Sequence, residues 1–160
     1  PLIPEQSEKY VFTAEWYDIP VPSTANLISE ADWQTLITVK SAVNKQIETA
    51  RNAKLIGSNL SAKVELWANA ELKTVLDQFA DELRFVLITS TVIVKDFDAA
   101  QGEATDLDGL RVQVSAAEGE KCVRCWHVLP DVNTHSAHLG LCARCIINLP
   151  SGQGEERKYA

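Results

Sequence analysis

Methionine is absent from this 160-residue sequence, and its three histidines all lie between positions 127 and 138. Without histidine elsewhere, a Ser-His-Asp or Cys-His catalytic site outside that short segment is excluded. The GxGxxG, GxxxxGKS/T and HExxH patterns of nucleotide-binding and metalloprotease sites are also missing. We therefore expect no catalytic site in this chain. Because translation begins at methionine, a chain that starts at Pro1 is expected to be processed or to be a piece of a longer protein, and we favour the piece.

Long apolar runs and an excess of basic residues are missing as well. No run approaches the roughly 18 residues that span a bilayer, and no basic and apolar leader opens the chain, so we expect a cytoplasmic protein without membrane contact. The net charge of -7 argues against a nucleic-acid surface over the whole chain, since phosphate binding needs clustered Lys and Arg. Residues 30–63 nevertheless carry five bases against three acids, so a local surface of this kind stays open.

The remaining composition is that of a folded protein, with 46% hydrophobic and 23% charged residues. Residues 1–28 hold four of the six prolines and are expected to be irregular. Ser29 with Asp32 indicates the start of a helix of about 22 to 25 residues. Its apolar stripe steps by three and four residues: Leu36, Val39, Val43, Ile47 and Ala50. Lys40, Lys45 and Arg51 lie on this helix, as phosphate contacts or as ordinary solvated charges.

Beyond Gly57 the apolar residues recur at every second position instead of every three or four. Val64, Leu66 and Ala68 alternate with Lys63, Glu65 and Trp67, which predicts a strand. Asn69 is expected to cap a helix that continues or restarts through Val86. Residues 91–97 and 110–116 are two more strand candidates, separated by a loop at 98–109. The fold class is therefore α+β, with a long N-terminal helix, about three strands and one or two helices. We expect three parts, at residues 1–57, 58–117 and 118–160.

The last part contains all four cysteines, Cys122, Cys125, Cys142 and Cys145, in the spacing C-x2-C-x16-C-x2-C. Each two-residue gap lets a tight turn present two thiolates, and two such turns complete a tetrahedral shell around one ion. A closed four-thiolate shell predicts one structural zinc in a ribbon built from two cysteine knuckles. Disulfides and a thioredoxin-like redox pair are disfavoured by the paired spacing. An iron site of the rubredoxin type stays open.

Three side chains beside the cysteines have two interpretations. Trp126 follows Cys125 and is expected to form the small core of the zinc ribbon. Alternatively, with Arg124 and Arg144 at equivalent places in the two knuckles, it forms an aromatic and cationic surface for RNA. The three histidines, His127, His135 and His138, are expected at the surface or behind the ligands, because four thiolates already fill the shell.

Several separated segments resemble one family. Three segments are similar to the carboxyl-terminal end of bacterial isoleucyl-tRNA synthetases: GEKCVRCWHVLPDV, LCARCIINL and GEERKYA. That family has a KCxRCWH first knuckle and a CxRC second knuckle. Three segments further upstream resemble the region of that family between its anticodon-binding helices and its zinc finger: VFTAEWYDIP, VNKQIETAR and DELRFVLITS. The resemblance covers about residues 10–160. Val123 stands where the family often has Pro, which alters the stiffness of the turn but removes no ligand.

This resemblance implies the tail of a class I aminoacyl-tRNA synthetase, which joins isoleucine to its tRNA through an adenylate. The HIGH-type and KMSKS-type motifs of that chemistry are not in this sequence, so ATP and Mg are expected only in a catalytic domain outside it, and editing is also expected elsewhere. The implied role is binding the anticodon side of isoleucine tRNA, as a monomer with the rest of the synthetase in cis. Cys122, Cys125, Cys142 and Cys145 match the family's zinc ligands; Arg124, Trp126 and Arg144 match its knuckle residues. Lys40, Lys45 and Arg51 follow only its general helix pattern.

Two rival functions fit part of the sequence. Formamidopyrimidine-DNA glycosylases end in a similar zinc finger and use an N-terminal proline as nucleophile, as Pro1 would be, but Leu2 stands where that family has a catalytic Glu. An independent zinc-ribbon module for protein partners would explain the acidic composition. It would not explain the resemblance upstream of the cysteines.

Overall fold

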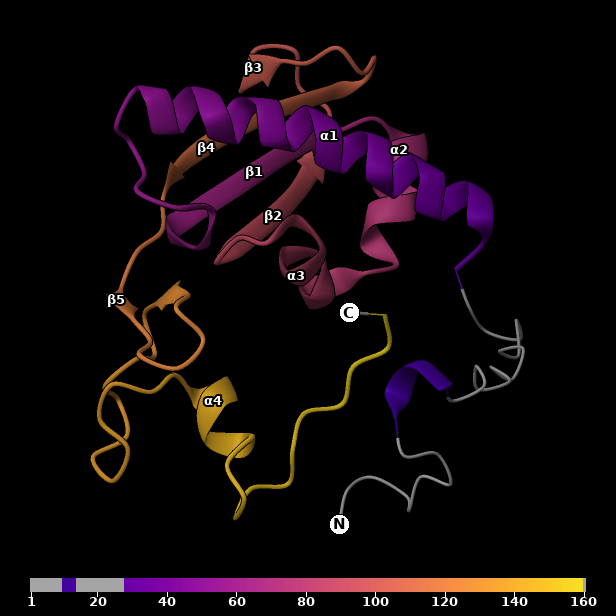
Figure 1. The fold of residues 1–160 in the computed structure, drawn as a ribbon. Helices are drawn as coiled ribbons and strands as arrows, with labels where there is room; N and C mark the ends of the chain where they lie inside the picture. Colours follow the sequence, from indigo (N-terminus) through magenta and orange to yellow (C-terminus); the bar gives the residue numbers. More distant parts are fainter. Residues whose placement is uncertain (1–9, 14–27, 160) are drawn as a thin grey trace.

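The computed structural model describes residues 10–13 and 28–159. A four-stranded sheet has the order β2-β1-β4-β3, in which β1 and β2 are parallel and the other neighbours are antiparallel. Figure 1 shows the long helix α1 lying across this sheet, with the cysteine-containing segment beyond one end of the strands. The α+β class is confirmed. None of the helices in the described ranges is long and apolar enough to cross a membrane.

Helix α1 (Glu30–Asn52) begins where the capping pattern predicted. The Ser29 side chain caps it by accepting the Asp32 backbone N–H at 3.1 Å, which satisfies one of the free donors of the first turn. All five residues of the predicted stripe are buried against the sheet: Leu36, Val39, Val43, Ile47 and Ala50. Burying each of the larger side chains contributes roughly 1.5–3 kcal/mol, so this face attaches α1 to the sheet.

Strand β1 (Ala62–Ala68) lies between β2 (Thr91–Asp96) and β4 (Leu110–Ala116). These are the three predicted strands, and Val64, Leu66 and Ala68 face the core as expected. Trp67 differs, because it points to the opposite face and is still only 5% exposed. The segment predicted as a loop folds over it and contains a short strand, β3 (Glu103–Ala104). A Cβ at Gly102 would lie 3.0 Å from the Trp67 ring, so glycine permits this close approach.

The predicted second helix is interrupted. Asn69 caps α2 (Ala70–Asp77) by accepting the Leu72 N–H at 2.9 Å, and the chain then forms a 3-10 turn, η3 (Ala80–Glu82), before it restarts as α3 (Leu83–Leu87). Helix α3 ends at Ile88, whose φ of 59° is left-handed. Two further 3-10 turns, η1 (Val11–Thr13) and η2 (Asn59–Ser61), complete this part of the described chain.

Residues 118–154, called here the finger, have little regular structure. The finger contains a two-stranded hairpin of β5 (Glu120–Lys121) and β6 (Val128–Leu129), and the short helix α4 (Ala143–Ile147). Its buried residues form a cluster separate from the main core: Cys122, Val132, Cys142 and Cys145. After α4 the chain runs back toward α3, where it ends (Figure 1).

Candidate metal centre and the surface around it

The four cysteines come together in the finger. Their sulfur atoms all lie within 4.8 Å of one another, and the Sγ atoms of Cys125 and Cys142 are 3.7 Å apart. A tetrahedral zinc with bonds of about 2.3 Å needs sulfurs about 3.8 Å apart, so the cluster fits one such ion. All four cysteines are free, and a disulfide would require sulfurs about 2.05 Å apart. The predicted site for one metal ion is confirmed, and the disulfide alternative is not what the structure contains.

Backbone turns present the two pairs of sulfurs. In the first knuckle the Cys122 N–H donates to the carbonyl of His127, and the Trp126 N–H donates back to the carbonyl of Cys122, both at 2.9 Å. In the second knuckle Cys142 immediately precedes α4 and Cys145 lies in its first turn. The Asp131 carboxylate accepts the Ala143 N–H at 2.7 Å, which connects the loop between the knuckles to the start of α4. The tight spacing of each pair is thus fixed locally, as the sequence predicted.

The protonation state of the four thiols depends on whether a cation is bound between them. Burial of Cys142, with the neighbouring Cys125 thiol, raises its pKa to about 11, and burial likewise raises the pKa of Cys145. Burial works in the same direction on Cys122, but N–H groups of Cys125, Cys142 and Arg124 outweigh it and lower the pKa of that thiol to about 6. Four thiolates so close together repel one another unless a positive ion offsets their charge. A divalent soft metal supplies that charge, and the donor set suits zinc.

Trp126 does not form the core of the finger, so that prediction is wrong. Its side chain is 60% exposed and its φ is 67°, a left-handed conformation that is rare for aromatic residues. The interior of so small a unit is instead filled by the cysteine sulfurs and Val132. The Lys121 ammonium lies 5.4 Å from the centre of the Trp126 ring, within the range of a cation–π contact.

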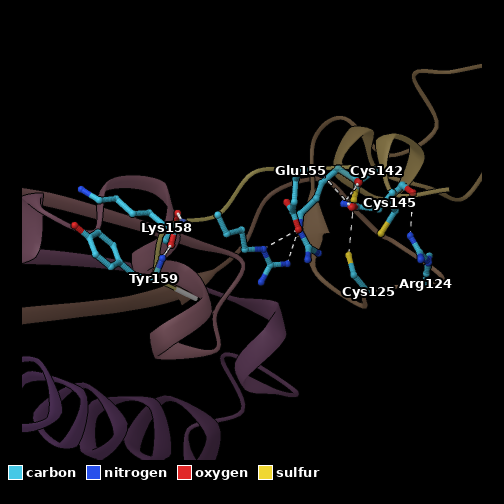
Figure 2. Close-up of polar contacts among 11 residues, drawn as sticks. Arg124, Cys125, Cys142, Cys145, Glu155, Lys158 and Tyr159 are labelled. Atoms are coloured by element: carbon cyan, nitrogen blue, oxygen red, sulfur yellow. Dashed lines mark hydrogen bonds and ion pairs between the residues drawn. The ribbon is translucent and has the colours of Figure 1, made fainter. Parts of the chain in front are cut away.

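The two knuckle arginines have different surroundings. Arg124 is exposed, and its guanidinium donates to the carbonyl of Cys145 at 3.0 Å. Arg144 is half-buried, and its Nε donates to both oxygens of Glu155 at 2.9 Å (Figure 2). Its guanidinium also lies 4.7 Å from the ring centre of Phe85 in α3. The exposed residues of the first knuckle are called here the knuckle surface: Lys121, Arg124 and Trp126. Arg144 instead faces the rest of the chain.

The predicted cations of α1 are not part of this group. Lys45 pairs with Asp106, and Arg51 pairs with Glu48 at 2.7 Å. Lys40 is half-buried. Within the described residues, no hydrogen bond, ion pair or ring contact joins these three side chains to the finger.

Of the three histidines, only His127 departs from the expected surface position. His135 is exposed and His138 half-buried, but His127 is only 7% exposed, with its ring edge-on to Phe85 at 6.0 Å. Burial, with the nearby charges of Arg84 and Arg144, lowers the pKa of His127 and favours its neutral form. Its Nε2 has no partner, and no histidine joins the cysteine cluster in the described chain. His127 is thus a packing residue between the finger and α3.

Sequence patterns gave no signal for the contacts that join the finger to the sheet. Ser90 accepts the Val128 N–H at 2.7 Å, and Glu82 accepts backbone N–H groups of residues 158 and 159. Both residues are ordinary polar positions in the sequence, without periodicity or spacing that links them to residues so far along the chain. Only the tertiary structure brings them to the finger.

Comparison with known proteins agrees with this geometry. Residues 119–147 match a family model described as the zinc finger found in FPG and IleRS. These residues include all four cysteines, so the match coincides with the cluster in the structure.

The whole chain is similar to bacterial proteins named isoleucine–tRNA ligase. It is 78% identical over 160 residues to the protein from Acinetobacter baylyi, which covers all of this chain and 17% of that protein. The protein from Vibrio cholerae is 46% identical over 158 residues, and that from Actinobacillus pleuropneumoniae is 44% identical over 157. The chain spans about a sixth of the length of these relatives. The resemblance predicted from the sequence is confirmed, and this coverage is consistent with a C-terminal region.

Proposed function

We propose that this chain is the tRNA-recognition tail of an isoleucine–tRNA ligase and binds the anticodon side of isoleucine tRNA. The parent enzyme would be a class I synthetase that carries out ATP-dependent aminoacylation in the cytoplasm, as a monomer. ATP and Mg would bind its catalytic domain, to which this chain is joined in cis. In this proposal the chain comprises the end of a helical region (1–57), a junction unit (58–117) and a zinc finger (118–160). The whole-length similarity to proteins of that name supports it.

In this proposal Cys122, Cys125, Cys142 and Cys145 hold one structural zinc. A closed shell of four thiolates leaves no position for a substrate, so the ion would act by holding the two knuckles together. Formation of the knuckles presents the side chains between and beside the cysteines to solvent. The metal would therefore serve binding indirectly, by shaping the finger.

The observation that carries the proposal is the exposure of Trp126 beside the ammonium of Lys121. A flat aromatic ring open to solvent stacks on an unpaired base, whatever the base, and the adjacent Lys121 would contact a phosphate beside it. Arg124, exposed in the same knuckle, would supply a second cation. This small basic group lies in a chain of net charge -7, so it is a local site and not part of a general basic surface. Arg144 contributes by supporting the finger through Glu155, and Lys40, Lys45 and Arg51 would be at most peripheral contacts.

Binding of the 160-residue chain to isoleucine tRNA and to a DNA duplex, measured by fluorescence anisotropy, tests the proposal. We expect tighter binding of the tRNA, which weakens as salt rises because phosphate contacts release counterions. Trp126→Ala should weaken tRNA binding by about 5- to 150-fold, since one base stack contributes roughly 1–3 kcal/mol.

The matched control is Phe97→Ala, which removes an aromatic side chain that is also exposed but follows β2. It should leave tRNA binding unchanged. Equal or tighter binding of duplex DNA would instead favour the glycosylase type of finger, which shares the matched family model. Absence of binding to either nucleic acid would favour a protein-interaction module.

A further inference from the structure

The chain itself and hydrogen bonds attach the finger to the sheet unit, defined here as α1 to β4, at three separate places. Ring contacts of His127 and Arg144 with Phe85 add to these. The first is the covalent connection after β4, where the Ala117 N–H donates to the carbonyl of Ser61 at 2.8 Å. The second is Ser90, which is fully buried. Its hydroxyl donates to the carbonyl of Leu60 at 2.5 Å and accepts the N–H of Val128, at the start of β6, at 2.7 Å. A single hydroxyl thus connects η2, the start of β2 and the finger.

The third attachment is the C-terminal strap, defined here as residues 155–159. The backbone N–H groups of Lys158 and Tyr159 each donate to a different carboxylate oxygen of Glu82, both at 2.6 Å (Figure 2). Hydrogen bonds to an ionised carboxylate are about twice as strong as those between neutral groups. The Tyr159 ring also lies 5.3 Å from that of Phe79, which belongs to the main core. The end of the strap is therefore held by the sheet unit.

The beginning of the strap is held by the finger. Glu155 receives two contacts from the Nε of Arg144, which lies on α4, and its own N–H donates to the Asn148 side chain at 3.2 Å. Between the two ends, the guanidinium of Arg157 lies 4.2 Å from the ring centre of Phe85. The strap therefore joins the second knuckle to η3 and α3, by contacts that involve both backbone and side chains.

We propose that the strap fixes the orientation of the finger on the sheet unit, and that Glu82 is the positioning residue through which it does so. A body attached at one point rotates freely, and one attached at two points still turns about the line between them. The strap provides a third hydrogen-bonded attachment, which together with the weaker ring contacts on Phe85 removes that rotation. If RNA bridges the knuckle surface and the sheet unit, a fixed orientation avoids the entropy cost of ordering two mobile parts on binding. This second step rests on the proposed function, whereas the orientation itself does not.

Glu82→Gln in the 160-residue chain tests the inference. The glutamine keeps the length of the side chain, but its amide nitrogen cannot accept a backbone N–H and its charge is lost. Amide exchange at Lys158 and Tyr159 should accelerate by about tenfold, since hydrogen bonds to charged groups contribute more than neutral ones. Residual dipolar couplings should show that the finger and α1 no longer share one alignment. Zinc content should not change.

Two further variants separate positioning from a general loss of stability. Asp81→Asn removes the neighbouring exposed carboxylate and should retain the common alignment, slow exchange and tRNA affinity of the unmodified chain. Glu82→Asp keeps both oxygens and should recover part of the common alignment. For tRNA, we expect Glu82→Gln to weaken binding by about tenfold.

A common alignment retained in Glu82→Gln would overturn the inference, and so would a lost alignment in Asp81→Asn. If the unmodified chain fails to bind tRNA, the proposed function is wrong, but the alignment and exchange data still decide the role of the strap. If the unmodified chain binds and Glu82→Gln binds equally well despite a lost alignment, orientation does not contribute to binding.

Discussion

At the scale of the residue, Trp126 combines two unfavourable features. Its left-handed backbone costs roughly 1–2 kcal/mol in a residue with a Cβ, and a large aromatic surface remains exposed to water. Strained conformations of this kind concentrate at binding sites, where the surrounding structure fixes them. Here the turn of the first knuckle fixes Trp126, because its N–H must reach the carbonyl of Cys122. A side chain that stabilised the finger would not need this arrangement.

We therefore expect Trp126→Gly to stabilise the finger by about 1 kcal/mol, since glycine adopts a positive φ without strain. The same change should abolish the tRNA contact of the ring. Thermal unfolding of the zinc-loaded chain, together with the anisotropy assay, measures both effects. Trp126→Ala retains the strain and should show the binding loss without the gain in stability. A finger destabilised by Trp126→Gly would mean that the ring packs after all.

Single residues differ in how far the sequence predicts them. The cysteine cluster was predictable because two-residue spacing and ligand chemistry are local properties that fix the site without knowledge of the rest of the fold. The exposure of Trp126 was not, because no local pattern says whether an aromatic residue beside a knuckle faces inward. Burial of His127 likewise depends on Phe85 of α3, a contact across distant parts of the chain.

At the scale of the element, the hairpin of β5 and β6 depends on Gly119. The φ of Gly119 is +107°, and a Cβ there would lie 2.3 Å from the carbonyl carbon and oxygen of Leu129. Backbone atoms cannot move aside as the end of a flexible side chain can. The glycine therefore allows the chain entering the finger to pass directly against β6, which brings Cys122 to its place beside the other cysteines.

Gly119→Ala should accordingly destabilise the finger by about 2–4 kcal/mol, from the steric overlap and the strained φ together. Gly154→Ala is the matched control, because Gly154 also has a positive φ of +76° but its nearest neighbouring atom would be 3.9 Å away. That variant should lose only the conformational part, about 1 kcal/mol. Amide exchange in the finger gives both free energies. Equal losses in the two variants would show that the approach to Leu129 is unimportant.

The helices and strands of six residues or more were predicted, whereas most shorter ones, including α4, were not. Helix α1 and strands β1 and β4 follow from the apolar period and from a capping serine, because each buries a regular face. Strands β3, β5 and β6 each contain two residues, too few to show any period. The interruption between α2 and α3 was also only one of two predicted options, since the apolar residues continue through it.

At the scale of the whole molecule, two interiors of different kinds lie in one chain. The main core is a hydrocarbon cluster of α1, α2, α3 and the sheet, and it contains no cysteine. The interior of the finger is formed mostly by cysteine residues. Its few apolar side chains bury too little surface to offset the entropy of ordering the segment, so a metal must contribute the rest. The contacts between the two parts are polar and aromatic: Ser90, Glu82 and Phe85.

Removal of the metal should therefore unfold the finger and leave the sheet and its helices folded. The purified chain is expected to contain about one zinc per molecule, and a strong chelator should remove it. Zinc binding to such fingers provides roughly 10–16 kcal/mol of apparent free energy, so without it the finger amides should lose their protection from hydrogen exchange. Protection in α1 and β1 should persist, because their core shares no residue with the cysteine cluster. Cys142→Ser should have the same effect as the chelator. Loss of protection throughout the chain would show that the strap and Ser90 couple the two parts into one cooperative unit. Iron in the purified protein would contradict the assignment of zinc.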